Sequence, residues 1–210
     1  MCQMNQYELP FWEKEILVIG IDEAGRGPIA GPLVVAGAIL PIGFQHPEIN
    51  DSKKLSEKKR EQLFTVIKEE AIAYQVEIVS IEEIDQLNIY QATKKAMIKI
   101  AKELSGMAVL TDAMPFQLED KPVVDIIKGD QKSISIAAAS ILAKVTRDHI
   151  MIELHQKYPN YGFDKHKGYP TKMHVEALEE YGVTEVHRKT YEPVKSIVKE
   201  TEKTIFDYLD

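Results

Sequence analysis

The sequence predicts an α/β fold in which a mixed central β-sheet is flanked by helices and followed by a helical C-terminal region. Segments rich in Val and Ile, bounded by Gly or Pro, come early in the chain, and helix-like and strand-like segments alternate after residue 55. No internal repeat and no Gly- or Ser-rich linker divides the 210 residues. We therefore expect a single domain over 1–210, with an α/β core over about 1–158 and C-terminal loop and helices over about 159–210.

Five segments carry strand signals. Residues 15–22 and 32–41 are short, apolar and bounded by Gly and Pro, which is typical of buried strands. Residues 74–81 form the third predicted strand. The last two, 107–113 and 122–130, each run into an acidic residue.

Helices are predicted between and after these strands, over 55–74, 89–104, 132–158, 171–182 and 192–209. Ser56 is a plausible N-cap for the first, and Gly106 suits the end of the second. The third is rich in alanine and ends before Pro159. In the last, one face carries four residues that predict packing onto the domain: Ile197, Thr201, Ile205 and Tyr208.

Charge and cysteine content limit the possible environments. The net charge of −7 argues weakly against a general nucleic-acid binder, but residues 51–60 carry five Lys or Arg against two acids, and residues 128–172 carry eight against four. The single cysteine, Cys2, lies in an N-terminal segment expected to fray. No signal peptide or membrane-spanning stretch is evident. We expect a cytoplasmic protein with no membrane partner.

Acidic residues end three of the predicted strands. Asp22 and Glu23 close the first, Asp112 the fourth, and Asp130 follows 18 positions later. Because a buried carboxylate is costly without a cation, hydrogen bonds or a shifted pKa, a cluster of four favours a divalent metal. Carboxylate ligands suit Mg²⁺ or Mn²⁺, and the six histidines form no short zinc motif. Taken singly, each acid is better explained as a cap or a solvated strand end.

The stretch Gly20 to Gly27, GIDEAGRG, has the outline of a phosphate-binding P-loop but departs from it in detail. Arg26 replaces the lysine, and Gly27 replaces the hydroxyl that would hold magnesium. Pro28 prevents an immediate long helix. Nucleoside triphosphate hydrolysis is therefore disfavoured.

Six blocks, in order, resemble the bacterial ribonuclease HII family: DEAGRGPIAGP (22–32), NDSKKLSEKKRE (50–61), TDAM (111–114), KGDQKSISIAAASILAKVTRD (128–148), YGFDKHKGY (161–169) and HRKTYEPVK (187–195). Ribonuclease HIII has an extra N-terminal domain and a threonine between the loop glycines, whereas Arg26 fills that place here and 21 residues precede Asp22. Ribonuclease HI lacks the DEAGRGP block.

The resemblance implies an RNase H-like fold and a metal-dependent endonuclease. Such an enzyme cuts the RNA strand of RNA/DNA hybrids and cuts 5′ to single ribonucleotides in duplex DNA, giving 5′-phosphate and 3′-hydroxyl ends. The family's metal-site acids match Asp22, Glu23, Asp112 and Asp130, which implies hydrolysis with two Mg²⁺ or Mn²⁺ ions. Asp130 could alternatively be a looser ligand that comes and goes with substrate.

The resemblance also assigns substrate contacts. Gly25, Arg26 and Gly27 match the loop whose backbone bonds the 2′-hydroxyl that distinguishes RNA from DNA. From the residues alone, GRGP is equally explained as a tight turn. Tyr169 matches the tyrosine that packs on the sugar after the ribonucleotide, at the RNA-to-DNA junction, although most loop tyrosines are packing residues. Pro170 stands where many relatives have glycine, which leaves fine substrate preference open.

Basic residues suit contacts with the phosphates of a duplex, and a solvated helix face explains each of them as well: Lys53, Lys132, Lys144 and Arg147. Ser140 and Lys144 lie four apart on one predicted helix, but no oxyanion loop supports a Ser-Lys nucleophile. A non-catalytic protein that binds hybrids remains the alternative to the nuclease. We expect a monomer.

Overall fold

The computed structural model describes residues 4–50 and 55–207, with side chains described up to Thr201. The chain divides into two compact units. The first contains Met1–Ala24, Val34–Ile78 and Thr93–Thr146, and the second contains Gly25–Leu33, Val79–Ala92 and Arg147–Asp210. Within the described residues, no helix is long and apolar enough to cross a membrane.

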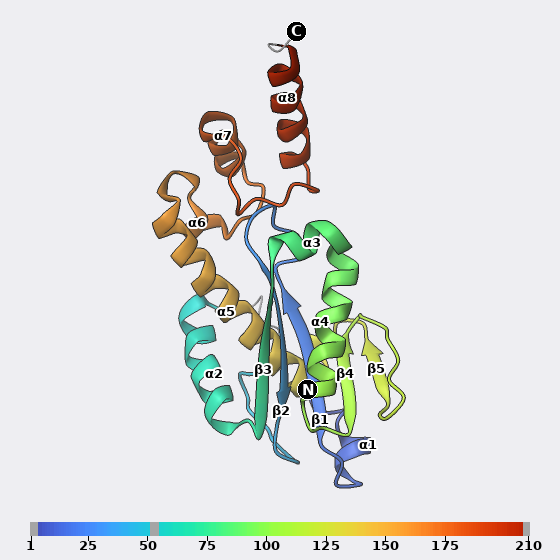
Figure 1. Cartoon of the computed structure of the whole chain (residues 1–210). Coiled ribbons are helices and arrows are strands. Elements are labelled where there is room, and N and C mark those ends of the chain that lie inside the picture. The colour runs from blue at the N-terminus through green and yellow to red at the C-terminus, as the bar shows by residue number, and fades with distance from the viewer. Residues whose placement is uncertain (1–3, 51–54, 208–210) are drawn as a thin grey trace. The chain divides into compact units, whose positions relative to one another are not determined.

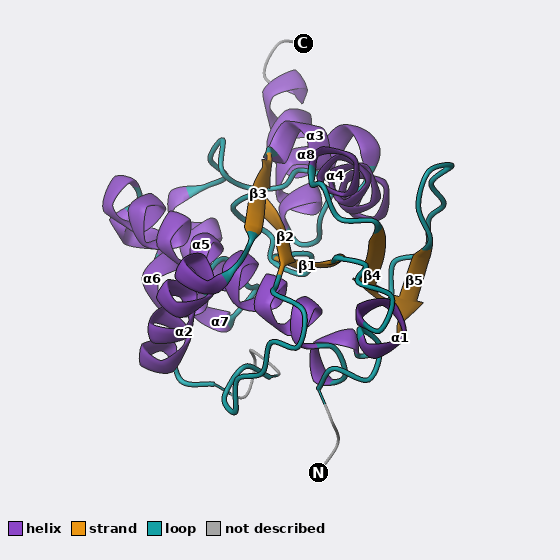
Figure 2. Cartoon of the chain, turned by 90° about the horizontal axis from the view of Figure 1, so that it is seen from below, coloured by secondary structure: helices purple, strands orange, loops and turns teal. Residues whose placement is uncertain are grey.

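A five-stranded mixed sheet forms the centre of the first unit, as Figure 2 shows nearly end-on. Its order is β3 (Ala73–Val79), β2 (Leu33–Ile39), β1 (Val18–Ala24), β4 (Ala108–Asp112) and β5 (Val123–Ile126). β1 is antiparallel to β2 and parallel to β4, which is in turn parallel to β5. The mixed sheet predicted from the sequence is confirmed.

The five predicted helices are present as α2 (Glu57–Glu70), α4 (Ile89–Glu103), α5 (Ile134–Lys157), α7 (Lys172–Tyr181) and α8 (Val194–Asp207) (Figure 1). Ser56 caps α2, as predicted, by accepting a hydrogen bond from the Lys59 amide. Three short helices were not predicted: α1 (Leu9–Trp12), α3 (Ile81–Leu87) and α6 (Phe163–His166). For α3 the sequence did carry a signal, since Ser80 accepts from the Glu83 amide in a Ser-x-x-Glu pattern.

Small residues on one face of the sheet let α5 approach closely. A methyl group on Gly20 would lie 2.1 Å from the Ser135 carbonyl carbon, so only glycine allows this contact between β1 and the start of α5. In the β1–β2 register Gly20 pairs with Ala38, and Asp22 with Ala36. Because alternate residues of a strand share a face, Asp22 points to the same side as Gly20, toward α5.

The opposite face of the sheet packs on α4. A methyl group on Gly37, in β2, would meet the side chains of Ile100 and Leu104 at 2.4 and 3.1 Å. Figure 2 shows α4 and α5 on opposite sides of the strands. The sheet of the first unit is thus covered on both faces, which explains why β1, β2 and β4 read as nearly continuous apolar runs.

Residues 5–8 of the N-terminal segment are held against the start of α5. Asn5 forms a β-bridge with Ser133. Glu8 is fully buried, and its carboxylate accepts from the Ser133 hydroxyl at 2.5 Å and from the Ser135 amide at 3.0 Å. Burial raises the pKa of Glu8. Through the bond from the Ser135 amide, Glu8 provides an acceptor for one of the free backbone amides at the N-terminus of α5. Cys2 lies outside the described residues, so its expected fraying remains a prediction.

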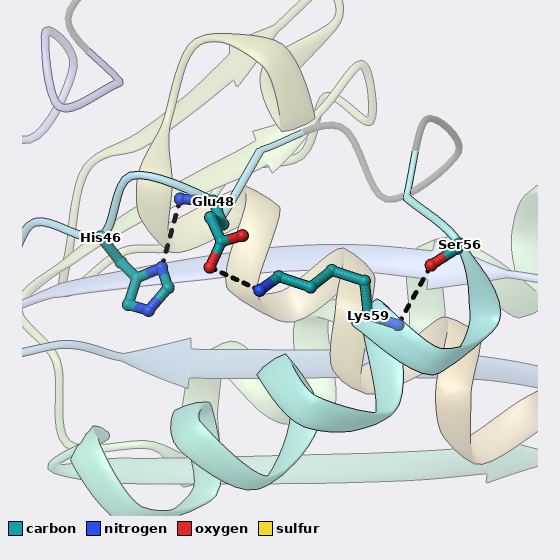
Figure 3. A network of polar contacts seen from close by, with 4 residues as sticks. All are labelled: His46, Glu48, Ser56 and Lys59. Carbon is teal, nitrogen blue, oxygen red and sulfur yellow. Dashed lines mark hydrogen bonds and ion pairs between the residues drawn. The ribbon is translucent and has the colours of Figure 1, made fainter.

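Polar contacts join the two sides of the segment that contains Lys53, which lies outside the described residues. Lys59 donates to the Glu48 carboxylate, and the Glu48 amide donates to His46 Nδ1 at 3.3 Å (Figure 3). The chain on either side of 51–54 is thereby held together, and the predicted phosphate contact of Lys53 remains a prediction.

The second unit has its own core. Its buried members are Ile29, Ala30, Met151, Tyr161, Phe163, Ala177, Leu178, Val186 and Val194, and Ile197 and Val198 pack against them. The first turns of α8 therefore contact this core, as the spacing of Ile197 predicted, while Thr201 is exposed. Ile205 lies beyond the described side chains, and Tyr208 beyond the described residues.

Candidate active site

Two of the predicted metal-site acids lie on neighbouring parallel strands. Gly20 pairs with Leu110 and Ile21 with Thr111, so that Asp22 and Asp112 come next on adjacent strands, at their C-terminal ends. β1 continues two residues past Asp22, through Glu23 and Ala24, in pairing with β2, whereas the predicted strand ended at Asp22. The convergence of acids at strand ends, expected from the sequence, holds for this pair.

Asp130 lies in a turn and not at the end of a strand. β5 ends at Ile126, four residues earlier than predicted, and Lys128 adopts a left-handed conformation that leads into a short 3₁₀ helix (η2), Gly129–Gln131. The Gly129 amide donates to Asp112 Oδ1 at 2.8 Å. Asp130 follows directly and is buried.

Asp22 sits in an environment that disfavours its charge. Burial raises the pKa of Asp22 well above its ordinary value, and repulsion from Glu23 and Asp112 raises it further. Hydrogen bonds from Ser140 and from the Glu23 amide oppose the rise. Ser140 is therefore a partner of Asp22, a role that sequence reasoning missed. The sequence carried no signal for it beyond the small residues of α5.

A divalent cation fits this donor set chemically, because hard carboxylate oxygens suit Mg²⁺ and Mn²⁺ and a cation removes the repulsion at Asp22. As the side chains stand, the described part of the chain contains no group of three or more His, Cys, Asp or Glu residues that could hold a metal ion. The convergence therefore rests on the strand register and on the Gly129 contact.

Arg188 binds the backbone of the glycine loop, residues 25–31. This side chain is fully buried and donates to three carbonyl oxygens: Gly31 at 2.9 and 3.0 Å, Gly25 at 2.7 Å and Arg26 at 3.2 Å. The Tyr191 hydroxyl also donates to the Arg26 carbonyl at 2.9 Å. Burial lowers the pKa of Arg188. Sequence reasoning assigned it no role, although HRKTYEPVK was among the blocks that carried the resemblance.

Arg147 forms a second buried support and not an exposed phosphate contact. Its guanidinium donates to the carbonyls of Ala30, Pro32 and Lys167 at 3.1, 3.0 and 2.9 Å. With 1% of its surface exposed, it is out of reach of a duplex. The phosphate contact expected from the sequence is wrong for Arg147, because its donors are spent on the backbone. Burial, followed by repulsion from Arg188, lowers the pKa of Arg147 to about 10.

Gly25 must be glycine at this position. Its φ is +100°, a conformation that other residues rarely adopt, and an added methyl group would lie 2.1 Å from Arg147 Nε. Gly27 is exposed, and a methyl group there would lie 3.3 Å from the Tyr169 ring. Tyr169 is itself 48% exposed. The structure thus brings Gly27 and Tyr169 together on the surface of the second unit.

Lys132 and Lys144 are partly exposed, in the first unit. Their phosphate contacts remain predictions.

Comparison with known proteins decides the family. A family model described as Ribonuclease HII matches residues 19–194. The chain belongs to the ribonuclease HII family. Ribonuclease HII of Bacillus cytotoxicus is 54% identical over 200 residues, which is 94% of this chain and 77% of the relative. That of Bacillus anthracis shows the same identity and coverage.

Solved ribonuclease H structures share the fold. The ribonuclease H2 of Pyrococcus horikoshii matches with a TM-score of 0.78 and 28% identity, covering 90% of this chain and 100% of that one. The RNase HII in a PCNA complex from Archaeoglobus fulgidus matches with a TM-score of 0.73 and 29% identity, over 84% and 96%. The predicted RNase H-like fold is confirmed.

Membership of the ribonuclease HII family defines the reaction. The protein is an endoribonuclease that hydrolyses phosphodiester bonds in the RNA strand of RNA/DNA hybrids and needs a divalent metal. Its substrate is nucleic acid.

Proposed function

We propose that Asp22, Glu23, Asp112 and Asp130 hold two divalent ions, Mg²⁺ or Mn²⁺, at the point of cleavage. The observation that carries the proposal is the convergence of Asp22 and Asp112 on adjacent parallel strands. The Gly129 amide binds Asp112, and Asp130 is the next residue along the chain. When bound, the ions supply an activated water and stabilise the leaving 3′ oxygen.

The protein's own groups prepare the site for these ions. Asp22 carries its proton more readily than an ordinary carboxyl, so it binds a cation in exchange for that proton, and Ser140 orients its side chain. The Gly129 amide holds one oxygen of Asp112, which leaves the other oxygen for a ligand. Metal binding is therefore expected to strengthen as the pH rises.

Recognition of the ribonucleotide is assigned to the loop Gly25, Arg26 and Gly27 together with Tyr169. Arg188 binds the Gly25 and Arg26 carbonyls of this loop, and Arg147 binds the carbonyls of Ala30 and Pro32 that follow it. This rigidity supports a role in bonding a 2′-hydroxyl without reorganisation. Tyr169 is assigned to the sugar that follows the ribonucleotide. Its exposed ring beside Gly27 supports the assignment, which gives cleavage 5′ to single ribonucleotides embedded in duplex DNA.

Lys53, Lys132 and Lys144 complete the proposed surface as phosphate contacts that position the duplex without reading its sequence. The protein is further proposed to act as a cytoplasmic monomer with a single domain over residues 1–210. Light scattering is expected to give the mass of one chain, 23.8 kDa. Calorimetry is expected to show one cooperative transition.

The test compares cleavage of three labelled duplexes: all DNA, one embedded ribonucleotide, and a full RNA/DNA hybrid. Each is incubated with Mg²⁺, Mn²⁺ or EDTA. We expect cleavage of the last two only, with either metal, leaving 5′-phosphate ends. Asp22→Asn and Asp112→Asn are expected to lose activity. Asp125→Asn is the matched control, because Asp125 is exposed on β5, in register with Thr111.

Each part of the proposal has its own contrary result. Activity of Asp112→Asn equal to that of the wild type would remove the metal-site assignment and favour another set of ligands. Cleavage of the hybrid without cleavage at a single ribonucleotide would refute the assignment of the loop and Tyr169. Gly27→Ala, which presses a methyl group toward the Tyr169 ring, is expected to reduce the preference for the ribonucleotide site.

A further inference from the structure

Three buried histidines lie behind the exposed Tyr169 in the second unit. His166 ends α6, His174 lies in α7, and His187 precedes Arg188. The rings of His166 and His174 stack with centroids 4.4 Å apart, and His174 Nε2 lies 3.1 Å from His187 Nε2. None of the three has a part in the hydrolysis described above.

The hydrogen bonds define the protonation of two of these rings. The Thr184 amide donates to His187 Nδ1 at 3.1 Å, so this nitrogen carries no proton and His187 Nε2 carries it. His187 Nε2 then donates to His174 Nε2. His174 therefore has its proton on Nδ1, which donates to the Tyr169 carbonyl at 2.9 Å. A directed relay runs from Thr184 through His187 and His174 to Tyr169.

His166 supports the same turn from the other side. The Gly168 amide donates to His166 Nδ1 at 3.2 Å, and His166 Nε2 donates to the Tyr161 carbonyl at 2.7 Å. The Tyr169 amide donates to the His166 carbonyl at 3.0 Å. The Tyr169 carbonyl also accepts from the Thr171 amide at 2.8 Å, so that His174 supplies the second of its two donors. Both backbone polar groups of Tyr169 are thus held, while its ring stays exposed.

All six ring nitrogens of the three histidines take part in these hydrogen bonds. A metal ion would have to break the relay to find a ligand, so the cluster is not a metal site. A mere packing role explains the apolar contacts of the rings with Phe163, but it does not require a directed relay that ends on the Tyr169 carbonyl.

We infer that His174 and His187 are positioning residues, which hold the Tyr169 carbonyl so that the ring meets the sugar at the RNA-to-DNA junction. The inference rests on the role of Tyr169 in the proposed function. A small rotation of the Tyr169 backbone moves the end of its ring by more than the backbone itself, and misplacement by about 1 Å is enough to weaken catalysis strongly. The relay therefore sets junction preference without touching the substrate.

The test uses two substitutions of His174 that lose the same ring. In His174→Asn the side-chain amide nitrogen takes the place of Nδ1 and keeps the bond to Tyr169. In His174→Gln the amide takes the place of Nε2 and loses that bond. The readout is the ratio of kcat/KM on a duplex with one ribonucleotide to kcat/KM on an uninterrupted hybrid, which has no junction. His149→Gln, exposed on α5, is the control.

We expect His174→Gln to lower this ratio by roughly five- to tenfold, the effect of one buried hydrogen bond, and His174→Asn to retain it. Tyr169→Ala is expected to lower the ratio at least as far. Adding His174→Gln to Tyr169→Ala is then expected to cause no further drop, because both changes act through the same ring.

The contrary results separate the two ideas. An unchanged ratio in Tyr169→Ala refutes the proposed role of Tyr169, and the inference falls with it. A lowered ratio in Tyr169→Ala, with a wild-type ratio in His174→Gln or an equal ratio in both His174 variants, overturns the inference alone. Where His174→Gln does not fold, His187→Asn and His187→Gln give the same comparison, because only glutamine keeps the donor to His174.

Discussion

Replacing Arg188 by methionine tests how the glycine loop is held. The substitution keeps a long, apolar stem and removes every donor. The carbonyls of Gly25 and Gly31 lose their bonds to the guanidinium, whereas the Arg26 carbonyl keeps the Tyr191 hydroxyl. A buried acceptor left without a partner costs about 1–3 kcal/mol, so the buried Gly31 carbonyl and the partly buried Gly25 carbonyl together cost at most about 2–6 kcal/mol.

Two effects oppose this loss of stability. The substitution removes the buried charge of Arg188, and it relieves the repulsion between Arg188 and Arg147. The relief is the smaller effect, because burial is the larger cause of the lowered Arg147 pKa. We therefore expect Arg188→Met to lower the free energy of unfolding by about 3 kcal/mol, toward the lower part of that range. For a chain of this size, that lowers Tm by roughly 10 °C.

Thermal and urea unfolding, followed by circular dichroism in metal-free buffer, measure this change. Arg188→Lys is the comparison, since a lysine keeps the charge but lacks the planar fork that reaches several carbonyls, and we expect an intermediate Tm. If Arg188→Met melted within about 2 °C of the wild type, the two carbonyls would have to find other partners, and the support assigned to Arg188 would be refuted.

Three further predictions concern the metal site, the sheet and the histidines. In metal-free buffer, Asp22→Asn is expected to raise Tm, because it removes a buried carboxyl that Glu23 and Asp112 repel. Mg²⁺ or Mn²⁺ at 100 times its Kd is expected to stabilise the wild type by about 2.7 kcal/mol but not this variant. If the metal raised the Tm of both proteins equally in thermal melts, the metal site would be contradicted. Gly20→Ala is expected to lower the free energy of unfolding by about 3 kcal/mol or more, measured in urea, because its methyl group would meet the backbone of Ser135. Gly43→Ala is the control, because a methyl group there meets nothing within 4 Å and only the positive φ of Gly43 opposes it. If the two variants lost the same free energy of unfolding, the close contact at Gly20 would be contradicted. Burial lowers the pKa of His174 and of His187 from the ordinary 6.5 to about 4. Between these values the unfolded chain binds more protons than the folded one, so the stabilisation is full above about pH 6.5 and is lost as the pH falls toward 4. Urea unfolding at pH 7, 6 and 5 should show this loss, and a free energy of unfolding that does not change with pH would contradict it.

Local patterns in the sequence were sufficient for the strands and the longer helices. Short apolar runs predicted all five strands, two of them with Gly and Pro at their boundaries, and helical spacing predicted α2, α4, α5, α7 and α8, because those signals lie within a few neighbouring residues. The short helices α1 and α6 escaped because four residues are too few for a periodic pattern. The four acids were singled out because carboxylates in such positions demand an explanation from charge alone, and their role as metal ligands remains a proposal.

The tertiary structure decided which charged side chains are buried and which backbone groups they bind. Arg147 and Lys144 look alike in the sequence, yet Arg147 is buried and spends its donors on three carbonyls far away in the chain. Glu8 meets Ser133 and Ser135 across 125 residues or more. Burial and long-range partners decide whether a charged side chain meets solvent, substrate or backbone. The sequence by itself therefore determined the strands and the longer helices and proposed the metal-site acids. Only the fold determined that Arg188 and Arg147 bind backbone carbonyls of the second unit and that His187 and His174 connect to the Tyr169 carbonyl, because these contacts join residues far apart in the chain.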